Sequence, residues 1–136
     1  MGPALATTDV TKGGSIVYEA MKQHGTLQVP LPPAPPLWRL DTGSAACCVL
    51  REAGFAEPVA VHVAQTWRLD SADDFFNAFY NGSVRTKALL RAQTAPALIA
   101  IRRAIDASLR SYERAGRIEI PMAGVLVSAR KPRASH

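Results

Sequence analysis

The chain has 136 residues, of which 48% are hydrophobic and 20% are charged, and its formal net charge is +5 at pH 7. These values are ordinary for a soluble globular protein, and the basic charge permits an anionic partner without requiring one. No run of 18 or more apolar residues occurs, which excludes a transmembrane helix, and the first 14 residues lack the pattern of a secretory signal.

We therefore expect a single cytosolic domain over residues 1–136, with mobile ends at 1–13 and 131–136. Gly2 does not indicate myristoylation, because position six is Ala6 instead of Ser or Thr.

A helix is expected first, opened by the turn Gly13-Gly14-Ser15 and ended by Gly25. Its apolar stripe consists of Ile16, Val17, Ala20 and Met21. The turn beside Lys12 resembles an anion cradle, but an ordinary N-cap is favoured because no strand precedes it.

Residues 28–40 carry five of the ten prolines and are expected to be extended. We interpret them as a rigid connector with Leu37 and Trp38 fixed in a core; the alternative is a PxxP ligand for a partner module.

The next helix is expected from Thr42 to about Ala53, with Asp41 as its N-cap and Gly54 at its end. It contains the adjacent cysteines 47 and 48. Because neighbouring cysteines rarely pair and the spacing of metal ligands is missing, both are expected to be buried and reduced.

Alternation of apolar residues predicts a strand over residues 59–69 with one face buried. That face carries Val59, Val61, Val63, Trp67 and Leu69, with His62 on the opposite face. Ser71 and Asp74 then have the spacing of a capping box, and they open an aromatic helix that Gly82 ends. The helix carries Phe75, Phe76, Phe79 and Tyr80.

A short helix over residues 84–93 is expected to use Val84, Leu89 and Leu90 as apolar positions. The longest helix follows, with Thr94 as its cap, Pro96 in its first turn and Gly116 at its end. Its apolar stripe consists of Leu98, Ile101, Ile105, Leu109 and Tyr112. Its charged residues Arg102, Asp106 and Arg110 occur at steps of four and are expected to pair with one another on the solvent side.

The second strand is expected over residues 118–129, interrupted by Pro121 and Gly124. The three consecutive apolar residues 125–127 predict cover on both of its faces.

In this order, the segments REAGFAEP, TWRLDSADDFFNAF, VRTKALLRAQ and IPMAGVLVSARKP resemble the C-terminal part of class I S-adenosylmethionine-dependent methyltransferases. The resemblance is to the branch that includes quinone-biosynthesis methyltransferases and proteins described as methyltransferase type 11. The segment SIVYEAMKQHGTLQVPLPPAPPLWRL is similar to the region after the fifth strand of that family, so the resemblance extends from about Ser15 to Pro132.

The resemblance implies an α/β fold, a truncated Rossmann-like sheet. Strands 59–69 and 118–129 would form an antiparallel edge hairpin packed with about five helices, three of them inserted over the substrate side. The family binds its cofactor through a glycine-rich loop and an acidic residue in its first half, and this sequence contains neither motif. No cofactor-binding or catalytic residue is therefore assigned, S-adenosylmethionine is implied only for the complete enzyme, and the chain is expected to be inactive alone.

Absence of the other strands would leave the edge of strand 118–129 unpaired and its core uncovered. Exposure of about 600 Å² of apolar surface would forfeit on the order of 15 kcal/mol as an upper value. We expect a homodimer first; a separate N-terminal methyltransferase half and the chain's own N-terminal segment are the other candidates to cover the gap.

The candidate substrate-pocket residues are Trp67, Phe76, Phe79 and Tyr80, together with Phe75, and the cations Arg68 and Arg85 as holders of an anionic group. The alternatives are that the rings form core and that the arginines form surface salt bridges. His24 and His62 have no partner by spacing, and no metal or nucleophilic constellation occurs.

Two functions are consistent with these patterns. The first is the substrate-lid segment of a methyltransferase. The alternative is a non-enzymatic module that dimerises and holds an apolar small molecule. A nucleic-acid binder is disfavoured, because no exposed platform of aromatic and basic residues is recognisable.

Overall fold

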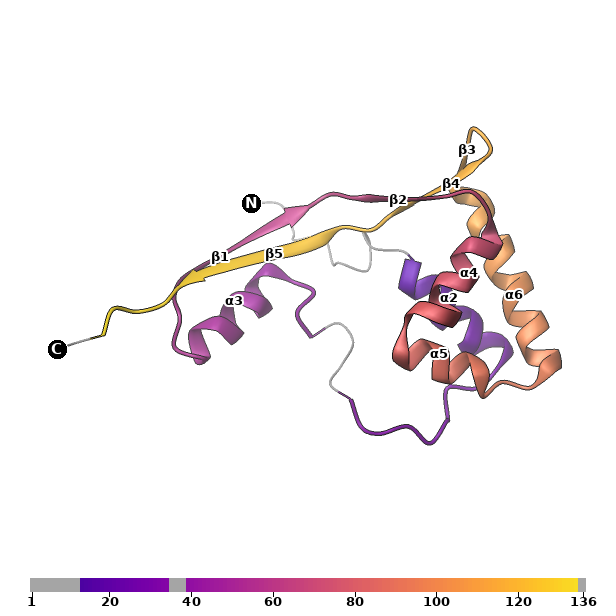
Figure 1. Ribbon diagram of the computed structural model, residues 1–136, viewed down its shortest axis with the longest axis horizontal. Helices are drawn as coiled ribbons and strands as arrows, with labels where there is room; N and C mark the ends of the chain where they lie inside the picture. The colour runs from indigo at the N-terminus through magenta and orange to yellow at the C-terminus, as the bar shows by residue number, and fades with distance from the viewer. Residues whose placement is uncertain (1–12, 35–38, 135–136) are drawn as a thin grey trace. The chain divides into compact units, whose positions relative to one another are not determined.

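A computed structural model describes residues 13–34 and 39–134 (Figure 1). Over these residues the fold is α/β, with five α-helices and two small antiparallel sheets, which confirms the predicted class. The chain divides into two compact units: unit 1 contains residues 33–34, 39–65 and 122–134, and unit 2 contains residues 13–32 and 66–121. The division reflects how densely residues contact one another and does not test whether the chain folds as one domain. The single domain therefore stays a prediction. The expectations for residues 1–12, Leu37 and Trp38 fall outside the described residues.

Unit 1 is a two-stranded sheet with one helix. Strands β1 (Ala56–Val63) and β5 (Gly124–Arg130) are antiparallel, with Val61 opposite Leu126, and α3 (Gly43–Glu52) lies against one face (Figure 1). The helix approaches the sheet closely, because a Cβ at Gly43 would lie 2.8 Å from the Cβ of Ala60. Glycine at this position therefore permits the contact.

The N-cap of α3 is Thr42, not Asp41 as the sequence predicted. Thr42 has extended backbone, and its Oγ1 accepts a hydrogen bond from the backbone N–H of Ala45 at 3.1 Å. Both residue types cap helices well, and the chain enters the helical conformation one residue later than expected.

Both predicted strands are broken. The first divides into β1 and β2 (Thr66–Leu69), and the second into β4 (Arg117–Pro121) and β5. The two breaks lie next to each other, because the N–H of Met122 donates a hydrogen bond of 2.9 Å to the carbonyl oxygen of Gln65. The break in the second segment lies at residues 122 and 123, between Pro121 and Gly124, the two interruptions that the sequence predicted. The antiparallel pairing of the two predicted segments is nevertheless present, as β1 with β5 and β2 with β4.

The valine face of β1 is exposed, contrary to the prediction that it is buried. Val59 is 57% exposed and Val61 52%, and Leu126 opposite is 62% exposed, so β5 is not covered on both faces either. The covered face is the one with Ala60 and Val127, against which α3 packs. Fully burying a side chain of this kind stabilises a protein by about 1.5–3 kcal/mol. Covering the exposed parts of these three side chains would therefore add roughly 3 kcal/mol of stability.

Unit 2 is a helical core with a three-stranded sheet in the order β2-β4-β3. Its helices are α2 (Gly13–His24), α4 (Ala72–Gly82), α5 (Val84–Arg91) and α6 (Ala95–Leu109). Helix α6 packs against both α2 and α4 (Figure 1). The largest fully buried side chains are Val17, Met21, Phe75, Leu90, Ile101, Ile105, Leu109 and Ile120. The apolar stripe predicted for the longest helix is thus confirmed at its centre. The prediction that Val84 makes an apolar contact in the short helix before it is wrong, because Val84 is 90% exposed.

The longest helix ends earlier than predicted. Helix α6 stops at Leu109, a 3-10 turn (η1, Arg110–Tyr112) follows, and then the short strand β3 (Glu113–Arg114) pairs with β4. Ala115 and Gly116 both have positive φ, at 50° and 77°. These values are typical of the two central residues of a type I′ hairpin turn, so Gly116 makes a hairpin and does not end a helix.

Arg102 pairs across helices and not along its own. Its guanidinium Nη2 lies 2.7 Å from Oδ1 of Asp73 in α4, although the steps of four along α6 predicted a partner on the same helix. This ion pair connects α4 to α6, whereas a pair within α6 would connect two residues of the same helix.

Gln93, between α5 and α6, holds the segment that follows α2. Its Oε1 accepts from the N–H of Thr26 at 2.9 Å, and its Nε2 donates to the carbonyl oxygens of Thr26 at 2.7 Å and Leu89 at 2.9 Å. A Cβ at Gly25 would overlap Oε1 of Gln93. Glycine at position 25 therefore makes room for this amide.

Two predicted caps are confirmed and provide a matched test. The Oγ of Ser71 accepts from the N–H of Asp74 at 3.1 Å, and Oγ1 of Thr94 accepts from Ala97 at 3.3 Å. Ser83 occupies the same position before α5 with extended backbone, but its hydroxyl makes no capping bond and is buried without a partner among the described residues.

We expect Ser71→Ala to lower the free energy of unfolding by about 1 kcal/mol, because an N–H of α4 loses its acceptor. Ser83→Ala should change it by less than about 0.5 kcal/mol or raise it, since no hydrogen bond is lost. Urea unfolding of the full chain, followed by circular dichroism, measures both. Equal losses from the two variants would contradict the assignment of the caps.

Candidate functional site

Three of the predicted pocket residues form one aromatic cluster. Trp67 in β2 lies with its ring centroid 5.5 Å from Phe75 and 5.9 Å from Phe79, and the two phenylalanines are 5.0 Å apart. Phe75 and Phe79 meet because residues four apart share a face of α4, and Trp67 faces them from the strand that precedes it. Phe75 is fully buried and the other two are half-buried.

Phe76 and Tyr80 form a second, stacked pair on the neighbouring side of α4, with centroids 5.5 Å apart. Arg102 lies over the ring of Phe76 at 4.4 Å and Arg91 over that of Tyr80 at 5.3 Å. Since cations are attracted to the faces of aromatic rings, these arginines tie α6 and α5 to α4. The rings thus contribute to the packing of unit 2, and their role in a substrate pocket stays a prediction.

The two predicted anion-binding arginines do not point to one site. Arg68 in β2 lies 3.5 Å from Glu119, its cross-strand partner in β4, and both side chains are exposed. Arg85 in α5 donates a hydrogen bond of 3.0 Å to the carbonyl oxygen of Pro32. Arg68 therefore makes the surface salt bridge that was its alternative interpretation, and Arg85 fastens the proline-rich segment to unit 2.

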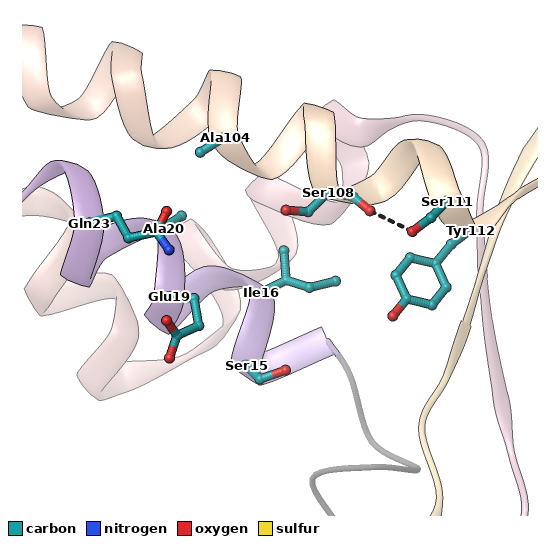
Figure 2. Close-up of a pocket in the computed structure, with 9 residues that line it drawn as sticks. All are labelled: Ser15, Ile16, Glu19, Ala20, Gln23, Ala104, Ser108, Ser111 and Tyr112. Carbon is teal, nitrogen blue, oxygen red and sulfur yellow. Dashed lines mark hydrogen bonds between the residues drawn. The ribbon is translucent and has the colours of Figure 1, made fainter.

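A hollow of about 360 Å³ lies between α2 and α6 (Figure 2). Helix α2 supplies one wall, and α6 with η1 supplies the other. Its lining residues are Ser15, Ile16, Glu19, Ala20, Gln23, Ala104, Ser108, Ser111 and Tyr112. Small side chains at Ala20 and Ala104 leave the space open, and none of the seven predicted pocket residues lines it.

The chemistry of this hollow is mixed. Glu19 and Gln23 offer a carboxylate and an amide, while Ser108, Ser111 and Tyr112 offer hydroxyls. The Oγ of Ser111 donates to the carbonyl oxygen of Ser108 at 3.0 Å. The volume is near the lower end for small-molecule sites, and the lining suits a small polar molecule better than an apolar one.

The sequence carries a signal for one wall of this hollow. Ser15, Glu19 and Gln23 recur at steps of four beside the apolar stripe of α2, so they had to form a polar wall next to the helix interface. What the sequence does not reveal is which helix faces that wall.

The remaining candidate groups are separated. His62 is exposed on the strand face opposite the valines, as predicted, and His24 is exposed at the end of α2. Cys47 is buried as expected, but Cys48 is exposed, with its Sγ 3.6 Å from Oε1 of Glu52, which corrects its prediction. Successive residues of a helix point about 100° apart, so both thiols could not face the sheet.

Within residues 13–34 and 39–134, no three metal-ligating side chains lie close enough together to hold an ion. The helices of this part of the chain are too short or too polar to cross a membrane. Comparison with protein-family models, with curated proteins and with solved structures finds no match to this chain.

Proposed function

We propose that this chain is the C-terminal, substrate-side segment of a class I methyltransferase with a Rossmann-like sheet. In this proposal the chain supplies the edge strands and the helices over the substrate. The strands that bind S-adenosylmethionine lie outside these 136 residues.

One observation carries the proposal. The segments before and after three successive helices pair antiparallel, with Val61 opposite Leu126 in one sheet and Trp67 opposite Ile120 in the other. Helices α4, α5 and α6 all lie between these segments in the chain. An antiparallel edge pair interrupted by a helical insertion is the arrangement that the resemblance implies for this part of the family fold.

The uncovered sheet is a second support. The β1–β5 sheet has two strands and an exposed apolar face, and isolated two-stranded sheets are marginal in water. Strands from a cofactor-binding half would extend such a sheet. The proposal assigns the substrate contacts to unit 2, with Trp67, Phe76, Phe79 and Tyr80 as candidates and with Arg68 and Arg85 as candidate anion-binding groups.

Titration calorimetry with S-adenosylmethionine tests the proposal. We expect no binding heat from the chain alone, because it has no glycine-rich loop. The chain co-purified with the product of an adjoining upstream reading frame should bind, and a Gly→Asp change in that product's glycine-rich loop should abolish the binding. Binding by the chain alone would contradict the proposal, as would an upstream region that encodes no such loop.

The alternative function is a non-enzymatic module that dimerises and holds a small molecule. The exposed face of Val59, Val61 and Leu126 favours it, because such a face suits assembly. The calorimetric test separates the two functions, since only the methyltransferase segment recovers cofactor binding with an upstream product.

A further inference from the structure

The face of the β1–β5 sheet opposite α3 is apolar at its centre and charged at one end. By strand alternation it presents Val59 and Val61 from β1 and Leu126 and Arg130 from β5. Each of the three apolar side chains is more than half exposed. At the end of the face, Nε of Arg130 lies 3.4 Å from Oε2 of Glu57.

We propose that this face, which we call the valine face, binds the same face of a second copy of this chain. The other face of the sheet is already covered by α3, so an association that buries the exposed apolar side chains of the sheet must use the valine face. The inference does not rest on the proposed function, because it is argued from the exposure and charges of the valine face in this chain alone.

Charge decides in favour of a second copy. The chain as a whole is basic at +5, but the charged groups at the end of the valine face are Glu57 and Arg130, which already pair, and the further cations Lys131 and Arg133 follow the end of β5. A nucleic acid or an anionic membrane would require an excess of cations around the apolar centre. The strand residues around this apolar centre carry no cation, and the ion pair at its end is complementary to the same pair in a second copy.

Symmetry makes the match specific. Two sheets that pack face to face keep their strands nearly aligned, about 10 Å apart. A twofold axis parallel to the strands places β1 of one copy over β5 of the other. Val61 then meets the Leu126 of the second copy, and Glu57 meets its Arg130, twice over, as an isologous interface requires.

The size of the valine face sets the strength of the dimer. Three branched side chains and their neighbours cover less than the roughly 800 Å² per partner that stable complexes bury. We therefore expect a dimer that dissociates on dilution, visible in sedimentation velocity as a coefficient that rises with protein concentration.

The first test places a charge in the centre of the face. Val61→Lys should raise the dimer dissociation constant at least tenfold. Because Val61 is half exposed, this change should leave the circular dichroism spectrum unaltered. Ile99→Lys is the matched control: Ile99 is 54% exposed on α6, which belongs to unit 2, and its replacement should not change the constant.

The second test reverses the charges. Glu57→Arg makes both rim charges positive and Arg130→Glu makes both negative, so each variant alone should dimerise at least tenfold more weakly. An equimolar mixture of the two should recover the original constant, because opposite rims then meet. Sedimentation of a monomer at every concentration would overturn the proposal, and so would a dimer insensitive to Val61→Lys or a mixture without recovery.

Discussion

Replacing Phe75 with alanine is expected to lower the free energy of unfolding by about 3–5 kcal/mol, because the ring is fully buried and its loss leaves a cavity. The cavity would open between Trp67 and Phe79, whose rings lie 5.5 and 5.0 Å from that of Phe75. Neither neighbour can collapse into the space without giving up its own contacts. Urea unfolding of the full chain measures the loss.

Val84→Ala is the control for this change. Val84 is 90% exposed, so its truncation should alter the free energy of unfolding by less than about 0.5 kcal/mol. If Phe75→Ala does not fold, Phe75→Leu keeps most of the volume and should cost less than the alanine variant. A cost for Phe75→Leu as small as that of Val84→Ala would contradict the position of Phe75 in the core.

Replacing Gln93 with alanine should cost about 2–3 kcal/mol, because the side chain makes three hydrogen bonds to the backbone of two segments. Thr26 is exposed, so water can replace part of the hydrogen bonding that its N–H and carbonyl oxygen lose with Gln93. Gln28→Ala removes an exposed glutamine from the same connecting segment and should cost less than about 0.5 kcal/mol. Thermal and urea unfolding measure the two variants side by side.

Gly25 provides a second measurement of the same contact. Gly25→Ala should destabilise the native chain, because the new Cβ would overlap Oε1 of Gln93. In the Gln93→Ala background the same change should cost less, since Oε1 of Gln93 is gone and the remaining close contact is with Cδ1 of Ile101 at 3.0 Å. Additive effects of the two substitutions would show that Gly25 and Gln93 do not interact.

The elements with a local signal were predictable from the sequence. Ser71 and Thr94 each cap a helix by accepting a hydrogen bond from the backbone N–H three residues later in the chain. The stripe of Ile101, Ile105 and Leu109 is buried. In each case the physical cause lies within one turn of helix or one face of it, so the sequence contains all of it.

Features that depend on distant residues were not predictable. The alternation of Val59 and Val61 indicates a strand with an apolar face, but not that α3 covers the other face. The spacing of Arg102 and Asp106 favours a pair within one helix, whereas the packing of α4 brings Asp73 closer. Gly116 looks like the end of a helix until the positive φ of Ala115 shows a hairpin.

The candidate site divides in the same way. The aromatic character of α4 and its junction with Trp67 follow from spacing, and the rings do meet. The partners of Arg68 and Arg85 lie 51 and 53 positions away in the chain, in β4 and beside Pro32, and no local pattern identifies them. The hollow between α2 and α6 was missed for the same reason, since its two walls come from opposite ends of the sequence.

Thr66 and Pro121 are paired neighbours in the β2–β4 ladder, so the 56 residues from one to the other begin and end at the same place. Segments whose ends meet can be lengthened, shortened or exchanged without pulling apart the scaffold that carries them. We expect changes of length between these two positions to leave the sheet of unit 1 intact. The limit on that freedom is α2, which packs on α6 from outside the segment and has to change with it.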